Sequence, residues 1–281
     1  MNPTKVKNTI KKFDEYLLID RGLHLTTSEG YCRCMSIALR RMRKLNPQYV
    51  EIKEMLLWMH KQKYSYSYIR NTILAIEHFT RFKENPIQLG KPKKPKRIIK
   101  DTLTEAEISR MIVMSSGNIR QKAIVCILAY AGIRNSEICN LKVEDLDLGN
   151  NQLRVMQGKN KKDRVVNISA ECSMILMEYL RTYARDKNDF LFTTLRTNQQ
   201  IHTRDIRKTV KTIAKRCGIE KRVFPHLFRH SLATNLLGRG ANLMLIKEQL
   251  GHAFIESTMV YAQSNPFRTK SEYDFYMPAY I

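Results

Sequence analysis

A short basic segment rich in proline divides this chain of 281 residues into two parts. Residues 90–97 read Gly-Lys-Pro-Lys-Lys-Pro-Lys-Arg. The two prolines oppose a helix and the neighbouring cations repel one another, so the segment is predicted to be an extended linker. Because each flanking part is long enough to bury a core, we expect a helical domain over residues 1–88, a linker over 89–101 and a second domain over 102–281.

The excess of basic residues indicates an anionic partner. The chain has 49 lysines and arginines against 26 aspartates and glutamates, which gives a formal net charge of +23. The regular phosphate array of nucleic acid rewards distributed cations, so double-stranded DNA is the predicted partner. A membrane surface is the weaker alternative, because no long basic amphipathic helix stands out. The linker is then either a strap along phosphates or a plain spacer. The candidate DNA-binding residues are Lys91, Lys93, Lys94, Lys96 and Arg97 in the linker, and Arg40 and Arg43 in the first domain.

Neither a membrane span nor a secretory signal is indicated. The longest apolar stretch, Ala123–Ile133, is too short to cross a bilayer, and the first residues lack the apolar core of a signal peptide. The cysteines form no C-x-x-C pair and match no zinc spacing, so we expect reduced core thiols, no metal and no cofactor. The expected location is the cytoplasm, in association with the nucleoid. The cysteines are Cys32, Cys34, Cys126, Cys139, Cys172 and Cys217.

Hydrophobic periodicity predicts four helices before the linker. Thr26, Thr27 or Ser28 is the expected N-cap of the second helix. Short joints between the helices favour a small bundle, and its basic faces are either DNA contacts or ordinary solvated surface. The first helix is expected to stop near Gly22, and the others to span Thr26–Lys44, Val50–Lys61 and Tyr66–Lys83.

The second domain is predicted to be mostly helical with a small sheet. Thr104 and Glu107 have the spacing of a capping box at a helix start. A buried helix over Ile119–Ala131 should end at Gly132, where the sequence offers a glycine stop. Two short strands, Gln152–Met156 and Arg164–Ile168, flank a lysine-rich turn. Further helices are expected at about 170–184, 203–217, 227–238 and 242–250, with Gly218, Gly238 and Gly251 as stops.

The second domain also contains a set of residues whose chemistry suits a phosphodiester. His226 and Arg229 lie three residues apart on a predicted helix, so their side chains share a face. Two guanidinium groups can hold the non-bridging oxygens of a phosphate, and histidines can donate or move a proton. A lysine on a flexible turn can protonate a leaving oxygen, and a tyrosine can attack phosphorus. The motifs of P-loop, serine-elbow and zinc-peptidase enzymes are absent from the sequence.

This set resembles the tyrosine recombinase (phage integrase) family, and especially its compact Xer-type members. The family has a G-x-R-x-x-E box, a lysine on a hairpin turn, H-x-x-R, L-G-H, and a tyrosine nine residues after the last histidine. Its turn often reads G-K-G-x-K, whereas Asn160 replaces the second glycine here, so Lys161 and Lys162 remain alternatives to Lys159. In matching order stand the box at residues 132–138 with Arg134, then Lys159, His226, Arg229, His252 and Tyr261.

The resemblance implies a mainly α fold, with an N-terminal four-helix core-binding (SAM-like) domain and a mixed α/β catalytic domain. That second domain would contain a small three-stranded antiparallel sheet. The implied activity is site-specific recombination, in which duplex DNA is cut and rejoined through a 3′-phosphotyrosyl intermediate without ATP or metal. In the implied catalytic set, Arg134, His226, Arg229 and His252 surround the scissile phosphate, Tyr261 is the nucleophile and Lys159 is the general acid. Glu137 is expected to bond local backbone or to brace Arg134.

The resemblance further implies a biological role and an assembly. We expect Xer-like resolution of chromosome or plasmid dimers by a homotetramer on paired DNA sites, with a monomer or dimer when free. The alternatives are an integrase or excisionase of a virus or mobile element, a resolvase of hairpin telomeres, and a type IB topoisomerase. A non-catalytic sequence-specific DNA-binding protein is the alternative outside the enzymes. The tail of about 263–281 is expected to exchange between neighbouring subunits, or else to fold back onto its own domain.

Overall fold

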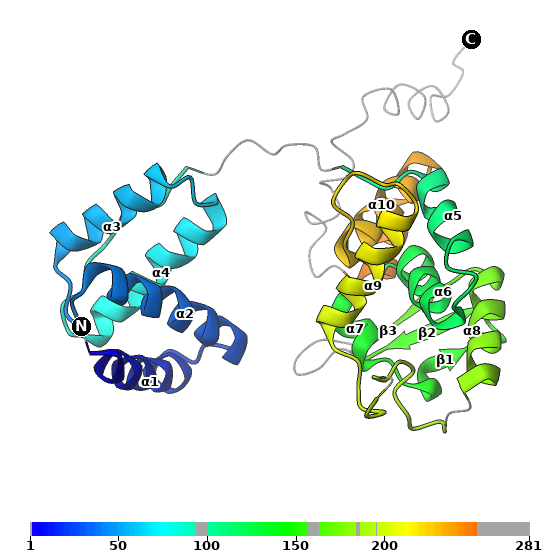
Figure 1. Ribbon diagram of the computed structural model, residues 1–281, viewed down its shortest axis with the longest axis horizontal. Coiled ribbons are helices and arrows are strands. Elements are labelled where there is room, and N and C mark those ends of the chain that lie inside the picture. Colours follow the sequence, from blue (N-terminus) through cyan, green and yellow to red (C-terminus); the bar gives the residue numbers. More distant parts are fainter. Residues whose placement is uncertain (1, 94–100, 157–162, 184–185, 195, 252–281) are drawn as a thin grey trace, which may run out of the picture. The chain divides into compact units, whose positions relative to one another are not determined.

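The computed structural model describes residues 2–93, 101–156, 163–183, 186–194 and 196–251. The chain forms two compact units, residues 1–98 and 99–281, which are described separately below (Figure 1). Across the described ranges, none of the helices combines the length and the apolar character that a membrane span requires.

Unit 1 is a bundle of four helices, as predicted. Its core contains Phe13 and Phe79, whose rings meet edge to face with centroids 5.1 Å apart. The helix α2 packs against both α1 and α4, so it lies at the centre of the bundle. The four helices are α1 (Pro3–Ile19), α2 (Leu25–Met42), α3 (Tyr49–Lys61) and α4 (Tyr66–Phe82).

The predicted N-cap of α2 is wrong. His24 occupies that position, and its Nδ1 accepts a hydrogen bond from the backbone N–H of Thr26 at 3.4 Å. Ser28 is fully buried instead, and its hydroxyl donates to the carboxylate of Asp14 on α1 at 2.5 Å. The hydroxyl near the helix start therefore ties two helices together rather than capping one of them.

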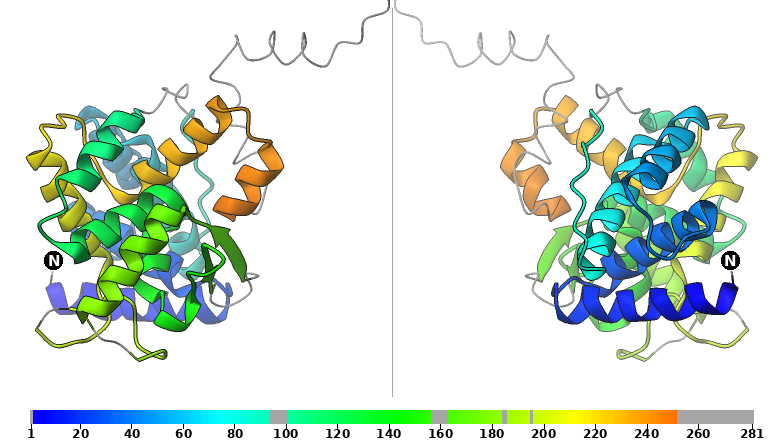
Figure 2. Two further views of the ribbon diagram at one scale, coloured as in Figure 1. Left: turned by 90° about the vertical axis from the view of Figure 1, so that its right-hand side faces the viewer. Right: turned by 90° about the vertical axis from the view of Figure 1, so that its left-hand side faces the viewer.

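Unit 2 is mainly helical with a three-stranded antiparallel sheet of order β1-β2-β3, as the resemblance implied. Leu153 on β2 pairs with Leu146 on β1 and with Val166 on β3. Figure 2 shows α11, in orange, beside this sheet, and α11 packs against β3. The strands are β1 (Leu146–Asp147), β2 (Gln152–Val155) and β3 (Arg164–Asn167); the α-helices are α5 (Glu105–Val113), α6 (Ile119–Cys126), α7 (Asn135–Asn140), α8 (Ala170–Tyr183), α9 (Thr203–Arg216), α10 (Pro225–Gly238) and α11 (Leu243–Leu250).

The predicted helix that ends at Gly132 changes its winding before it stops. α6 is α-helical only to Cys126, and Ile127–Ala131 forms a π-helix. Gly132 closes it in the left-handed conformation, with φ of +59°, and a Cβ there would lie 2.6 Å from a methyl carbon of Leu232. The left-handed backbone therefore favours a glycine, and a larger residue would also displace the side chain of Leu232 on α10. π-helical turns inside α-helices are frequent at functional sites.

The sequence also predicted where three other helices begin or end. The capping box at Thr104 is confirmed, since its hydroxyl accepts from the N–H of Glu107 at 3.2 Å and the carboxylate of Glu107 returns a bond. Gly251 ends α11 with φ of +62°, as predicted. α10 ends at Gly238, as predicted, although the positive φ of +85° belongs to Gly240.

Candidate active site

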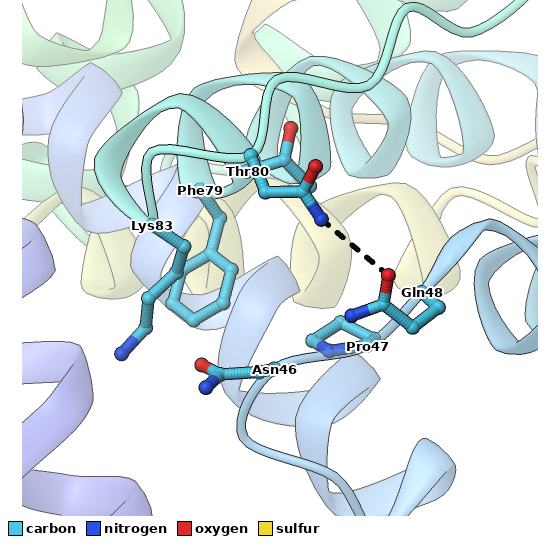
Figure 3. A pocket seen from close by; sticks show the side chains of 7 residues that line it. Asn46, Pro47, Gln48, Phe79, Thr80 and Lys83 are labelled. Atoms are coloured by element: carbon cyan, nitrogen blue, oxygen red, sulfur yellow. Dashed lines mark hydrogen bonds between the residues drawn. The ribbon is translucent and has the colours of Figure 1, made fainter.

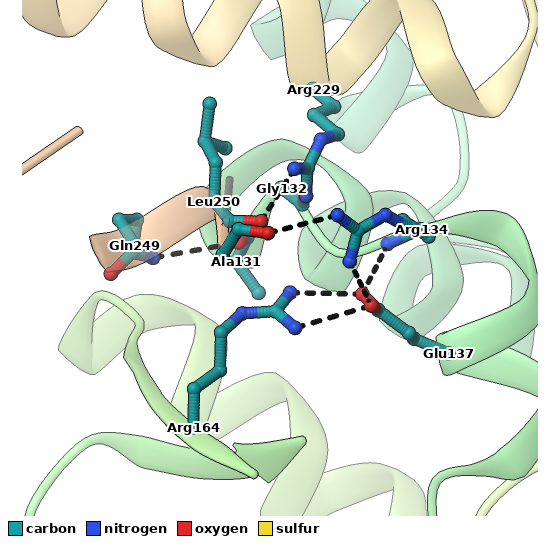
Figure 4. Close-up of polar contacts among 9 residues, drawn as sticks. Ala131, Gly132, Arg134, Glu137, Arg164, Arg229, Gln249 and Leu250 are labelled. Atoms are coloured by element: carbon teal, nitrogen blue, oxygen red, sulfur yellow. Dashed lines mark hydrogen bonds and ion pairs between the residues drawn. The ribbon is translucent and has the colours of Figure 1, made fainter. Parts of the chain in front are cut away.

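Side chains from three elements of unit 2 meet where α11 ends. Arg229 comes from α10, Arg134 and Glu137 from the start of α7, and Arg164 from the first position of β3 (Figure 4). The polar contacts of the cluster reach the backbone oxygen of Gly251, directly before His252 in the chain. Two of the predicted catalytic arginines, Arg134 and Arg229, thus lie in one cluster.

Arg229 is a buried cation held by two backbone carbonyls. Its side chain is 2% exposed, Nη1 donates to the oxygen of Gly132 at 2.9 Å, and Nη2 donates to the oxygen of Leu250. Gly132 caps the π-helix and Leu250 ends α11, so both carbonyls belong to helix C-termini, which carry partial negative charge. The guanidinium group therefore locks the ends of two helices against α10.

Arg134 is the more accessible of the two predicted arginines. Its side chain is 32% exposed, Nη1 donates to Oε1 of Glu137 at 2.5 Å, and Nη2 donates to the oxygen of Gly251 at 2.9 Å. A cation at the N-terminus of α7 opposes the helix dipole. Glu137 offsets this effect, and the expectation that Glu137 braces Arg134 is confirmed by their contact.

The carboxylate of Glu137 collects hydrogen bonds from two arginines. It is 8% exposed and accepts from the backbone N–H of Arg134 at 2.7 Å as well as from both guanidinium groups. Burial alone would raise the pKa of Glu137. The hydrogen bonds and charges of Arg164 and Arg134 outweigh burial and lower that pKa to about 2. Glu137 is therefore ionised throughout the physiological pH range.

Arg164 was not singled out by the sequence reasoning. Its guanidinium group forms a two-pronged contact with Glu137, with Nη1 3.1 Å from Oε1 and Nη2 2.9 Å from Oε2. A Cβ added to Gly251 would lie 2.6 Å from Nε of Arg164, so the backbone of Gly251 lies directly against this side chain. An arginine whose side chain is nearly buried needs an anionic partner, but the sequence alone does not show that Arg164 is buried.

Gln249 is a second residue that the sequence reasoning missed. Its side-chain amide is almost buried, accepts from the N–H of Asn167 at 3.0 Å and donates to the oxygen of Asn167 at 2.8 Å. The amide pairs with β3 as the backbone of another strand would. Gln249 thereby fastens α11 to the end of β3. The next residue, Leu250, is the one whose oxygen accepts from Arg229.

Some of the other predicted site residues lie in the described part of the chain and others lie outside it. His226 is exposed in the first turn of α10, one turn before Arg229. Lys91 and Lys93 are exposed, and so are Arg40 and Arg43 at the end of α2. Several predicted residues lie outside the described part of the chain: Lys159 with its alternatives Lys161 and Lys162, His252, Tyr261, Lys94, Lys96, Arg97 and the tail of about 263–281.

The helix α9, of 14 residues, presents a cationic face that the sequence analysis did not identify. Its inner side buries Ile206, Val210 and Ile213. Its basic residues recur at intervals of three and four, which places them on one side of the helix. That spacing was readable in the sequence and was overlooked. The exposed face consists of Arg204, Arg207, Lys208, Lys211 and Lys215.

A small hollow lies elsewhere, within unit 1. It is built between the segment that joins α2 to α3 and the end of α4, so it is separate from the arginine cluster (Figure 3). Among the residues that the structure describes, no group of three or more His, Cys, Asp or Glu side chains is placed to hold a metal ion. The hollow is lined by Asn46, Pro47, Gln48, Phe79, Thr80, Lys83 and Asn85.

Comparison with known proteins places this geometry in a family. Residues 101–268 match the model of the phage integrase family. A tyrosine recombinase of Pseudothermotoga lettingae is 34% identical over 178 residues, an alignment that covers 63% of this chain and 61% of that protein. The tyrosine recombinase XerA of Pyrococcus horikoshii is 34% identical over 264 residues, covering 92% of this chain and 84% of XerA.

The similarity extends to a solved structure. The crystal structure of a XerA recombinase has a TM-score of 0.58 and 31% sequence identity to this chain, with 98% of this chain and 100% of that one covered. The match includes both units, whereas the family model begins only at residue 101.

Proposed function

We propose a mechanism for this chain on the premise that it belongs to the phage integrase family and is a site-specific tyrosine recombinase of the Xer type, an enzyme that cuts and rejoins DNA. The observation that carries the mechanism is the convergence of Arg134 and Arg229 on the end of α11. His252 directly follows Gly251, the residue that caps α11, and Tyr261 follows His252 by nine residues.

In the proposed reaction the two arginines stabilise negative charge on the scissile phosphate. The exposed part of Arg134 offers N–H groups to a non-bridging oxygen, while Arg229, with the helix ends that it locks, sets the position of the pocket. His226 and His252 donate further hydrogen bonds. Because catalysis rests on positioning and fixed charge, neither ATP nor a metal is required.

The covalent step conserves the energy of the phosphodiester. The phenol oxygen of Tyr261 attacks phosphorus, the bond from phosphorus to the 5′-oxygen breaks, and Lys159 gives a proton to the departing 5′-oxygen. A tyrosine hydroxyl has a pKa of about 10 in water, so a dense positive field favours its ionisation during the attack. The 5′-hydroxyl of a partner strand then attacks the phosphotyrosyl link, which restores the tyrosine and joins the strands.

The proposed partner is double-stranded DNA, bound mainly through its phosphates. Support comes from the exposed face of α9, from Lys91 and Lys93 of the linker, and from Arg40 and Arg43 of α2. On paired sites we propose a homotetramer in which the tail of about 263–281 exchanges between subunits. A truncation after Pro266 should then weaken assembly on DNA without abolishing binding by a single subunit.

Xer-like resolution of chromosome or plasmid dimers is the favoured biological role, in the cytoplasm with the nucleoid. The match to XerA over both units supports this role. Integration or excision of a mobile element uses the same chemistry, so it remains the second candidate. A map of where the protein cuts in its host genome separates the two roles: one fixed chromosomal site supports dimer resolution, and the ends of an element support integration.

The decisive experiment asks whether Tyr261 becomes attached to DNA. Wild-type protein on a nicked duplex, from which the cleaved end can diffuse away, should accumulate a covalent adduct on denaturing gels. Tyr261→Phe should bind the same duplex with unchanged affinity and form no adduct. Tyr49→Phe, which alters an exposed tyrosine of unit 1, is the matched control and should behave as wild type. An adduct that persists in Tyr261→Phe overturns the assignment of the nucleophile.

A further inference from the structure

We propose that Arg164 is a positioning residue for strand cleavage, because it anchors Glu137 so that Arg134 faces the phosphate, and because it supports the end of α11 at Gly251. The proposal rests on the proposed function, since it assigns a role toward the same phosphate. It concerns a residue that lies on β3, outside the motifs of the catalytic set.

The first argument is the way in which the two arginines share one carboxylate. Arg164 contacts both oxygens of Glu137, whereas the guanidinium group of Arg134 reaches only Oε1. If Arg164 were absent, the carboxylate could rotate and form the two-pronged pair with Arg134 that such groups prefer. Arg134 would then direct both of its terminal nitrogens at Glu137 instead of at a phosphate oxygen. Arg164 therefore keeps N–H groups of Arg134 available to a phosphate oxygen.

The second argument is charge. Glu137 carries one negative charge and faces the two guanidinium groups of Arg134 and Arg164. The group of three retains one net positive charge, which the site needs in order to stabilise an anionic phosphate. The side chain of Arg164 is only 10% exposed, so solvent screens its charge weakly.

The third argument is the contact with Gly251. Gly251 contacts both arginines: its backbone abuts Arg164, and its oxygen accepts from Arg134 at 2.9 Å. The next residue is His252. A shift of Arg164 therefore moves the peptide that leads to His252 and Tyr261, the last two residues of the predicted catalytic set.

The experiment compares Arg164→Gln and Arg164→Lys with a matched control. The control, Arg239→Gln, removes an arginine that also contacts both oxygens of a glutamate, Glu105, but at an exposed position of the same unit. Single-turnover formation of the adduct on nicked DNA is measured together with DNA affinity and thermal unfolding. We expect Arg164→Gln to cleave roughly 10²-fold more slowly, Arg164→Lys to be intermediate, and Arg239→Gln to match wild type. DNA affinity should change less than threefold in all three.

A double-mutant cycle, in which Arg164→Gln is combined with Arg134→Ala, distinguishes positioning from a merely structural effect. Arg134→Ala alone should slow cleavage roughly 10²–10³-fold. If Arg164 acts through Arg134, the double variant should be about as slow as Arg134→Ala, whereas independent effects multiply. Multiplied effects overturn the proposal, as does an Arg164→Gln variant that cleaves within threefold of wild type.

The cycle uses Arg164→Lys if Arg164→Gln fails to fold, with the same two criteria. An Arg164→Lys variant that folds and cleaves as wild type, with no coupling to Arg134, overturns the proposal as well. Wild-type protein that forms no adduct would instead refute the proposed function itself.

Discussion

Glu137 must stay ionised if Arg134 and Arg164 are to remain anchored. Its carboxylate is nearly buried, and the only described cations that reach it are these two guanidinium groups. The lowered pKa of about 2 means that the folded protein holds this group charged more firmly than the unfolded chain does. The anchoring of the cluster is therefore coupled to stability at acid pH.

The variant Glu137→Gln tests this coupling. A carboxylate with a lowered pKa stabilises the fold fully above its unfolded pKa of about 4.3, and this stabilisation disappears as the pH falls through about 2. We expect the difference in unfolding free energy between wild type and Glu137→Gln to shrink by roughly 2 kcal/mol between pH 7 and pH 3. Urea unfolding of both proteins at each pH measures it. A difference that is constant with pH contradicts the assignment.

At single residues, motif spacing in the sequence identified two arginines that lie in one cluster, but it did not identify a residue whose position depends on a distant partner. Arg134 and Arg229 were identified because their boxes have a characteristic spacing. Arg164 was not, since its partner Glu137 lies 27 residues away and the contact depends on how β3 packs beside α7. Residue spacing within one element carries no information about such a pairing.

Among the elements, α11 depends on a side chain for its connection to the sheet. Gln249 replaces a strand partner for Asn167, whose N–H and carbonyl both bond to its amide. Buried backbone groups without partners are costly, so this amide holds the position of α11 as well as satisfying the strand.

Replacing Gln249 by leucine keeps the volume and removes its two hydrogen bonds to Asn167, together with a longer one to the oxygen of Ala131. We expect Gln249→Leu to lower the unfolding free energy by about 2–3 kcal/mol, because two backbone groups of Asn167 lose their partner. Adduct formation should also slow, since α11 carries the carbonyl that Arg229 contacts. Gln152→Leu is the control, because it removes only an exposed bond to the side chain of Asn167. Equal unfolding free energies for the two variants would refute the role of Gln249.

The kinds of elements were more predictable than their details. Apolar periodicity located both longer strands and most of the helices to within a few residues, but it gave no range for the short helix α7. It could not distinguish the π-helix Ile127–Ala131 from an α-helix, because every turn of this segment is apolar and its winding is decided by α10 and β3. The short strand β1 was implied by family resemblance alone, since two residues have no period of their own.

At the scale of the whole molecule, the positive charge is its dominant physical property. The chain has a net charge of +23 on 281 residues, so its basic side chains repel one another until an anionic partner neutralises them. Both units and the linker contribute exposed cations, so phosphate contacts are expected along the chain rather than at one point. The face of α9 is one of the described contributions.

Salt dependence measures how many of these contacts form. The logarithm of the DNA association constant should fall linearly with the logarithm of salt concentration, with a slope of about −0.9 for each phosphate neutralised. If Arg207 and Lys211 on α9 each contact a phosphate, the double variant Arg207→Gln/Lys211→Gln should reduce the magnitude of the slope by about 2.

The matched control must remove the same charge from another surface. Arg181→Gln/Lys187→Gln also removes one arginine and one lysine, both exposed, from the end of α8 and the segment after it. Nonspecific attraction depends on total charge, so it would change equally in the two double variants, whereas direct phosphate contacts change only with α9. A smaller slope for the α9 variant alone therefore places α9 on the DNA, and equal slopes for both variants exclude it.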